Sequence, residues 1–282
     1  MRIHTYDHTP LKIHELRRTV LCELASFKGC PNTLEELQAI NCVVTSLEGL
    51  ENTSLKKLDV GACENLASLQ GCPSTIEELV ARGTRITSLA EIENFNIKKL
   101  DVGGCKKLGS LQGCPSTLEE LNATCTTIVS LEGLQSTCVK KLDVSKCEKL
   151  ASLKGCPSTL EEITGLPGLD ITSLEGLENT GLKKLDVKRC EKLASLKGCP
   201  DTLEELVTTQ SGITALDGLE NTRLVKLVVG IGMDPEIPEA LAKGDAVVVG
   251  ERTGVICNRP DGGKYYRVEF DNDGGTSDYL KV

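Results

Sequence analysis

The chain has 282 residues, of which 39% are hydrophobic but only 2% aromatic, and it contains no Trp. Its core must therefore be aliphatic, which favours stacked repeats over a single irregular core. The net charge of −9 argues against a general affinity for nucleic acids or anionic membranes. The N-terminus has no apolar signal-type segment, and no run reaches the roughly 18 apolar residues of a membrane span. We therefore expect a cytoplasmic protein.

Residues 1–12 precede the first repeat and are expected to form an N-terminal cap. The chain's three histidines, His4, His8 and His14, lie in or beside this segment. Their spacing fits no standard zinc motif. We interpret them as surface residues.

Residues 13–233 repeat with a period of about 21 residues, which is interrupted by a single insertion within GLPGLDIT (165–172). The template is L-x-x-L-x-(V/A)-x-x-(C/T). Its first position recurs eleven times, at Ile13, Leu34, Leu55, Ile76, Ile97, Leu118, Val139, Leu160, Leu182, Leu203 and Leu224. Self-similarity at this period is typical of a solenoid in which every coil adds one unit to a continuous core.

The template resembles that of the leucine-rich repeat family over roughly residues 11–233. Coils such as LDVGACENL resemble the cysteine-containing variety, and coils such as ITSLEGLEN resemble the short repeats of regulatory-subunit and internalin-like proteins. The resemblance implies an α/β solenoid of about eleven coils with a parallel β-sheet on its concave side. Because so short a coil leaves too little chain for a long convex helix, we expect tight turns or 3₁₀ segments on the outside.

The residue before the second Leu of the template points away from the core, because side chains alternate faces along a strand. This outward row alternates in charge at every coil, as Glu36, Lys57, Glu78, Lys99, Glu120, Lys141, Glu162, Lys184, Glu205 and Lys226. Opposite charges on neighbouring strands stabilise the sheet by a few tenths of a kcal/mol per pair. We interpret the row mainly as structural; a ligand-binding row is the alternative.

The fourteen cysteines follow the repeat. One set alternates with Leu or Ile at an inward position: Cys30, Cys72, Cys114, Cys156 and Cys199. Its members lie two coils or ~10 Å apart, which is beyond the reach of a disulfide. A second set shares a slot with Thr and Ser where the chain leaves the strand: Cys63, Cys105, Cys147 and Cys190. We predict buried, reduced thiols and no metal or cofactor, although Cys42 and Cys63 occupy neighbouring coils and could bridge.

Two further outward rows consist mostly of small or polar residues, and their bulky exceptions are the candidate protein-binding positions. Ile40, Val80 and Arg82 form one irregular patch, and Lys188, Val207 and Val228 form another near the C-terminal end. Exposed apolar residues on a rigid concave sheet suit protein binding, although scattered apolar residues are normal on any surface.

The insertion in coil eight has two interpretations. Leu166, Pro167 and Gly168 could bulge outward as a recognition loop, or the insertion could be a neutral outcome of repeat duplication.

Beyond the repeats, residues 234–244 are expected to form a capping helix or linker, with Asp234 as its N-cap and Gly244 as its stop. Residues 245–282 contain short β-type runs separated by turn residues. Their G-D-x-V-x-V, G-V-I and Y-x-V-x-F segments resemble a small SH3-like β-barrel of the Tudor, KOW or CAP-Gly kind. Tyr265, Tyr266 and Tyr279 could form an aromatic cage for a ligand, or could simply be the core of this barrel.

No nucleophile–base pair, phosphate-binding loop or metal cluster is recognisable in the sequence. We therefore expect a monomeric, non-enzymatic scaffold or adaptor that binds a protein partner through the concave face, the C-terminal barrel or both. The alternatives are a pathogen effector or antigen-like repeat protein, or the recognition part of a larger enzyme such as a ubiquitin ligase.

Overall fold

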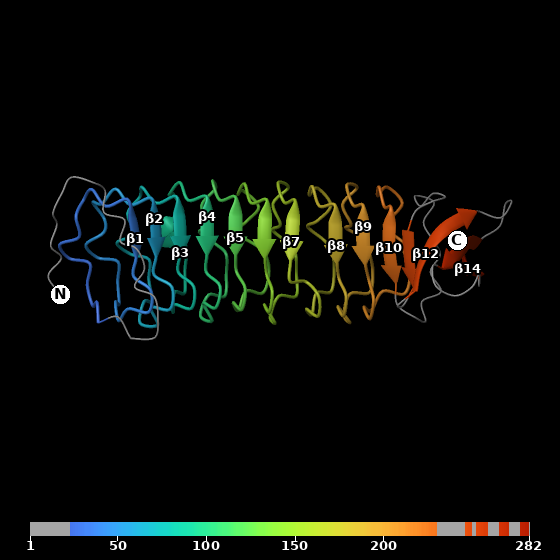
Figure 1. The fold of residues 1–282 in the computed structure, drawn as a ribbon, viewed down its shortest axis with the longest axis horizontal. Helices are drawn as coiled ribbons and strands as arrows, with labels where there is room; N and C mark the ends of the chain where they lie inside the picture. The colour runs from blue at the N-terminus through green and yellow to red at the C-terminus, as the bar shows by residue number, and fades with distance from the viewer. Residues whose placement is uncertain (1–22, 230–245, 250–251, 259–264, 271–276, 282) are drawn as a thin grey trace.

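The computed structural model describes residues 23–229 and four C-terminal segments, 246–249, 252–258, 265–270 and 277–281. The expected N-terminal cap, the first part of the first coil, the three histidines and the helix or linker expected at 234–244 lie outside the described residues. The described part of the repeat region is an elongated β-solenoid, with one short strand per coil following the next along its length (Figure 1).

Ten strands mark the coils of the repeat region. They are β1 (Glu36–Gln38), β2 (Lys57–Asp59), β3 (Glu78–Val80), β4 (Lys99–Asp101), β5 (Glu120–Asn122), β6 (Lys141–Asp143), β7 (Glu162–Thr164), β8 (Lys184–Asp186), β9 (Glu205–Val207) and β10 (Lys226–Val229). Nine turns of the solenoid therefore separate β1 from β10, and the step from β7 to β8 is longer than each of the others by a single residue. The predicted repeat solenoid with a parallel sheet is confirmed.

The α/β label of the sequence analysis is not supported. Within the described residues the sole helix is a three-residue 3₁₀ turn, η1 (Ala90–Ile92). The outer side of each coil is instead closed by tight turns, such as the one in which the amide of Leu50 donates to the carbonyl of Leu47 at 3.1 Å. The short repeat explains this, because a coil of this length has no room for a long helix before the chain returns to the sheet.

The core is a continuous aliphatic column inside the coils. In one coil, the side chains of Leu55, Leu58 and Val60 are 0%, 1% and 0% exposed, and the same positions are buried in the coils around them. Burying one such side chain contributes roughly 1.5–3 kcal/mol. Each coil thus depends on its two neighbours to cover its apolar faces.

A threonine in four of the five GCP-type coils ties that coil to the preceding one. Thr75 Oγ1 donates to the carbonyl of Leu55 at 2.7 Å, and Thr117 Oγ1 donates to that of Ile97 at 2.9 Å. The same bond recurs two coils further on, from Thr159 to Val139 at 2.8 Å. The Thr of the repeated GCPSTLEEL segment is therefore a link between coils.

The ladder of strands is interrupted between β7 and β8, and we call this break the seam. Strands β1 to β7 form one seven-stranded sheet, and β8 to β14 form a second one. Gly165 lies directly before the seam with φ of +86°, in the left-handed region that favours glycine. An extra glycine in this conformation is typical of a β-bulge, which bends the strand and disrupts its pairing.

The interpretation of Leu166 as part of an outward recognition loop is wrong. Leu166 is 1% exposed, whereas Pro167 and Gly168 are exposed. Its carbonyl accepts a hydrogen bond from Cys190 Sγ at 3.3 Å, as an alanine carbonyl does for the equivalent cysteine two coils earlier. Leu166 therefore occupies the inward slot of the template, and Gly165 is the extra residue.

The C-terminal segments contain β11 (Ala246–Val249), β12 (Arg252–Asn258), β13 (Tyr265–Phe270) and β14 (Ser277–Lys281). β11 pairs in parallel with β10 on one side and antiparallel with β12 on the other. The described strands then continue in the open order β11-β12-β13-β14. The SH3-like barrel is not supported, because both edges of its expected first strand are used to extend the solenoid sheet. The predicted boundary at residue 245 stays a prediction.

In residues 23–229 and the four described C-terminal segments, no helix is long and apolar enough to cross a bilayer.

Candidate protein-interaction face

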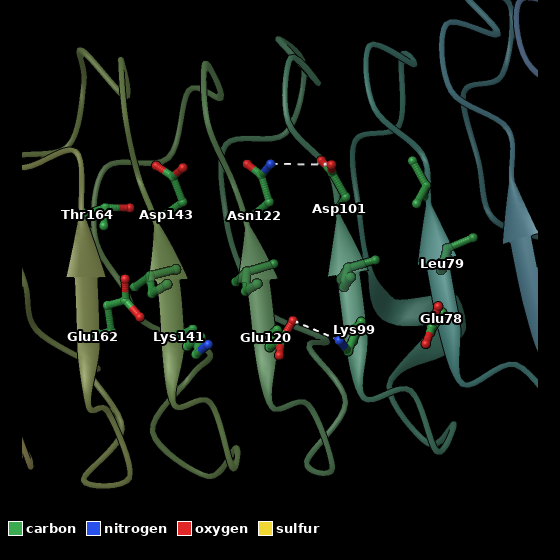
Figure 2. A pocket seen from close by; sticks show the side chains of 14 residues that line it. Glu78, Leu79, Lys99, Asp101, Glu120, Asn122, Lys141, Asp143, Glu162 and Thr164 are labelled. Carbon is green, nitrogen blue, oxygen red and sulfur yellow. Dashed lines mark hydrogen bonds and ion pairs between the residues drawn. The ribbon is translucent and has the colours of Figure 1, made fainter.

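The outward side of strands β1 to β10, here called the sheet face, carries the predicted row of alternating charges. Strand register places Glu78 beside both Lys57 and Lys99, and the same alternation continues on each side of the seam. Lys99 Nζ lies 3.1 Å from Glu120 Oε2, as Figure 2 shows, and Lys184 Nζ lies 2.8 Å from Glu205 Oε1. The predicted alternation is confirmed by the strand register, and cross-strand ion pairs join four pairs of its neighbouring positions: Lys57 with Glu78, Lys99 with Glu120, and Glu205 with both Lys184 and Lys226.

A second row of alternating charges runs beside the first and was missed in the sequence analysis. Lys183 pairs with Glu204 at 3.0 Å, and the equivalent pairs four and six coils earlier lie at 4.0 and 3.9 Å. The signal was present in the sequence, because every Glu or Lys of the first row except Lys226 is preceded by a residue of the same charge. The row ends at Val225, which is 48% exposed at a position where the alternation would place a Lys.

Glu205 has the most complete surroundings of any carboxylate in the first row. It contacts Lys184 at 2.8 Å and Lys226 at 3.7 Å, from the strands on either side. The hydrogen bond from Lys184 is the main cause of a lowered pKa for Glu205, and the charges of Lys184 and Lys226 act in the same direction. Its side chain is 32% exposed, so solvent screens the interaction and the gain in stability is small.

A third row of the sheet face is acidic at every second coil, at Asp59, Asp101, Asp143 and Asp186. In each case Oδ1 accepts a hydrogen bond from the backbone amide two residues later, at 2.9, 2.8, 2.9 and 3.0 Å. Asn122 accepts the same bond from the amide of Thr124 at 3.0 Å. These bonds hold the side chains in one orientation. Partial burial is the main cause of a raised pKa for Asp59.

A shallow groove of about 460 Å³ runs across the sheet face over β3 to β7. The first row contributes Glu78, Lys99, Glu120, Lys141 and Glu162 to its lining, and the third row contributes Val80, Asp101, Asn122, Asp143 and Thr164. Figure 2 shows both rows side by side, with the amide of Asn122 directed at the carboxylate of Asp101. That hydrogen bond, from Nδ2 to Oδ2, is 3.3 Å long.

The structure brings together only part of the first predicted patch. Val80 lines the groove, and Arg82 reaches the next strand, where its Nε lies 3.8 Å from Asp101 Oδ2. Ile40 is 44% exposed, but it follows β1, two coils away from Val80. Val80 and Arg82 therefore form one local feature, and Ile40 is separate from it.

The other predicted positions lie nearer the C-terminus. Val207 and Val228 are register partners on β9 and β10, and both are half-buried. Lys188 is exposed just beyond the end of β8. Tyr265 and Tyr266 belong to β13, and Tyr279 on β14 stands opposite Arg267.

The cysteines of the inward slot are buried as predicted, with Cys30 and Cys156 only partly so. Burial raises the pKa of Cys72, Cys114, Cys156 and Cys199 to about 12. At such values the reactive thiolate is almost absent at neutral pH.

The second set of cysteines makes the predicted hydrogen bonds to the backbone. Cys63, Cys105 and Cys147 each donate from Sγ to an alanine carbonyl of a preceding coil, at 3.0 to 3.1 Å. Thr84 and Thr126 fill the same slot in the coils between them and donate to a carbonyl within their own coil. Across the described ranges, no three His, Cys, Asp or Glu side chains are placed to hold a metal ion together.

No family model matches the chain, and no curated protein matches it. Among solved structures, it is similar to the functional domain of InlJ from Listeria monocytogenes, a domain that includes a cysteine ladder. The two are 16% identical with a TM-score of 0.31, over 70% of this chain and 48% of the other, so the chain spans about half of that structure.

Proposed function

We propose that the protein is a non-enzymatic scaffold or adaptor that binds a protein partner through its sheet face. The observation that carries the proposal is the departure from the repeat at Val80 and Arg82. The charged rows recur at every second coil, so a partner that contacts these rows alone could shift along the solenoid by two coils. Val80 is a half-buried apolar side chain in the groove, and Arg82 is exposed beside it. Together they distinguish the β3 end of the groove from its β7 end.

The sheet face is suited to this role because it is held rigidly. Its first row is tied by ion pairs across neighbouring strands, and its third row is tied by side chain to backbone hydrogen bonds. A surface that is ordered before binding loses little conformational entropy when a partner docks. A rigid surface with a few distinctive residues is therefore a good platform for protein recognition.

The test is capture of partners by the immobilised full chain from a cytoplasmic extract. Val80→Lys removes the apolar contact in the groove, and Val129→Lys makes the same change at an outer position that is 55% exposed. A third variant, Tyr266→Ser/Tyr279→Ser, changes β13 and β14. We expect loss of the partner only for Val80→Lys.

Two other outcomes of the capture experiment would contradict binding through the groove. Loss only for the double Tyr variant would assign recognition to the C-terminal strands. Retention by all three variants would show that the sheet face around Val80 is not the binding surface.

We also propose that the scaffold works as a cytoplasmic monomer without a cofactor. Buried thiols at so many positions suit a reducing compartment. Light scattering of the purified chain and fractionation of its source cells would test the two statements; a stable dimer or a secreted protein would contradict them.

A further inference from the structure

The position that the second set of cysteines fills, here called the cysteine slot, alternates between Thr and Cys in the middle of the solenoid. Successive coils place there Thr84, Cys105, Thr126 and Cys147. The alternation fails nearer the N-terminus, because Cys42 stands where a threonine would be expected, one coil before Cys63. Two neighbouring coils therefore both carry a cysteine in this slot.

The later coils show how closely side chains approach each other in the cysteine slot. Thr84 Oγ1 lies 3.3 Å from Cys105 Sγ, and the equivalent atoms two coils further on have the same separation. Cys105 Sγ also donates to an alanine carbonyl of the threonine's coil, at 3.1 Å. Cys63 makes the same bond, to the carbonyl of Ala39 at 3.0 Å. Its sulfur is therefore directed at the side chain of Cys42, which takes the place of the threonine.

The backbones of these two coils are held at a spacing that suits a disulfide. β1 and β2 are in register, and beyond them the amides of Ala39 and Asn41 donate to the carbonyls of Asp59 and Gly61 at 2.7 and 2.8 Å. The coils thus stay paired up to the residue before Cys42. Paired strands lie ~4.8 Å apart, and the Cα atoms of a disulfide are usually about 4.4–6.8 Å apart. The bond needs no large movement of the backbone.

We propose that Cys42 and Cys63 are a redox-sensitive pair that forms a reversible disulfide on exposure to a hydroperoxide such as hydrogen peroxide. Cys42 is 3% exposed and Cys63 is 0% exposed, so oxidation begins at Cys42. Its sulfur bonds to one peroxide oxygen, the O–O bond breaks, and the other oxygen leaves as water with the thiol proton, which gives a sulfenic acid. Cys63 then attacks this sulfur, the S–O bond breaks, and a second water leaves with the Cys63 proton. The two thiols lose two electrons in total, and the peroxide is reduced to two waters.

The disulfide joins the coil of β1 to the coil of β2. The first of these is less completely buried, because Leu34 and Leu37 are 8% and 9% exposed, whereas Leu55 and Leu58 are 0% and 1% exposed. The bond also closes a loop of one full coil, residues 43–62, which restricts the unfolded chain. Oxidation therefore stabilises the coil of β1, whose own packing is the weaker of the two.

The test is disulfide mapping of the full chain. The native protein is treated with hydrogen peroxide, its remaining thiols are blocked with N-ethylmaleimide in denaturant, and it is digested with trypsin without reduction. Trypsin separates the two cysteines because two lysines lie between them. We expect mass spectrometry to find residues 29–56 joined to residues 58–82 through Cys42 and Cys63, with the other cysteine of each peptide blocked. Dithiothreitol should abolish the link.

A pair of matched variants tests the assignment. Cys42→Thr restores the Thr and Cys neighbours of the later coils, so we expect it to fold normally and to lose the link. Cys105→Thr is the same substitution in the same slot, at a cysteine whose neighbours there are threonines, and it should form the link as the wild type does. In urea denaturation followed by circular dichroism, peroxide should raise the midpoint of the wild type and of Cys105→Thr but not that of Cys42→Thr.

The exposed Cys138 reports whether the oxidant has acted. If Cys138 is fully oxidised while Cys42 and Cys63 remain thiols, the proposal is wrong. A link through Cys63 that persists in Cys42→Thr would also overturn it, because another cysteine would then be the partner. The same holds if both sulfurs become sulfinic or sulfonic acids, which dithiothreitol does not reduce.

Discussion

The glycine at the seam offers a sharp test of how the solenoid absorbs its extra residue. Gly165 has φ of +86°, and a Cβ built on it would collide with the backbone nitrogen, the Cα and the hydroxyl oxygen of Ser145. Gly168, three residues later, has a similar φ of +79°, but a Cβ on it would meet no atom within 4 Å. The two glycines therefore share the same conformational constraint and differ in steric surroundings.

The expected cost of each substitution follows from this difference. For Gly168→Ala we expect only the penalty for a left-handed residue with a Cβ, about 1–2 kcal/mol. Gly165→Ala adds a collision with backbone, which must be relieved by moving the coil of β6 or β7, at a further cost of about 1–3 kcal/mol. We therefore expect Gly165→Ala to lower the free energy of unfolding by about 2–5 kcal/mol.

The assay is urea denaturation of both variants, followed by circular dichroism, with the slope m compared as well as the midpoint. A smaller m for Gly165→Ala would indicate that the two halves of the solenoid unfold separately at the seam. If the two substitutions cost the same, the close contact with Ser145 does not exist and our description of the bulge is wrong.

Three other predictions concern the cysteines and the charged rows. In the native protein at pH 8, a thiol reagent should modify the exposed Cys138 first, whereas Cys72 and Cys114, with pKa of about 12, should react only after unfolding; fast native labelling of either would refute their burial. Lys99→Glu should place three Glu side chains in a row and lower stability by about 1 kcal/mol or less, with the loss shrinking in high salt. Because the folded pKa of Glu205 is lowered by Lys184, its small stabilisation should be present above the unfolded pKa and lost as pH falls through the folded value; an NMR titration that shows no downward shift would contradict this.

The sequence by itself determined the solenoid, the alternating first row and the inward cysteines. Each of these follows from two regular periods, the alternation of side chains along a strand and the stacking of equal coils. The position of a residue in the repeat therefore specifies whether its side chain points inward or outward and which residues flank it on the adjacent strands. Glu78 can thus be placed between Lys57 and Lys99 from the sequence alone. The paired charges of the second row obey the same periods and could have been found in the same way.

The tertiary structure decided the features that break the period. The sequence does not show which residue of GLPGLD is the extra one. In the structure Leu166 is buried and Gly165 takes a positive φ, so the packing of Leu166 between coils and the backbone conformation of Gly165 decide it together. Likewise, β11 has the composition of a first barrel strand, but its pairing with β10 depends on the free edge that the last repeat presents. Such outcomes depend on contacts between segments distant in the chain, which no local pattern of residues encodes.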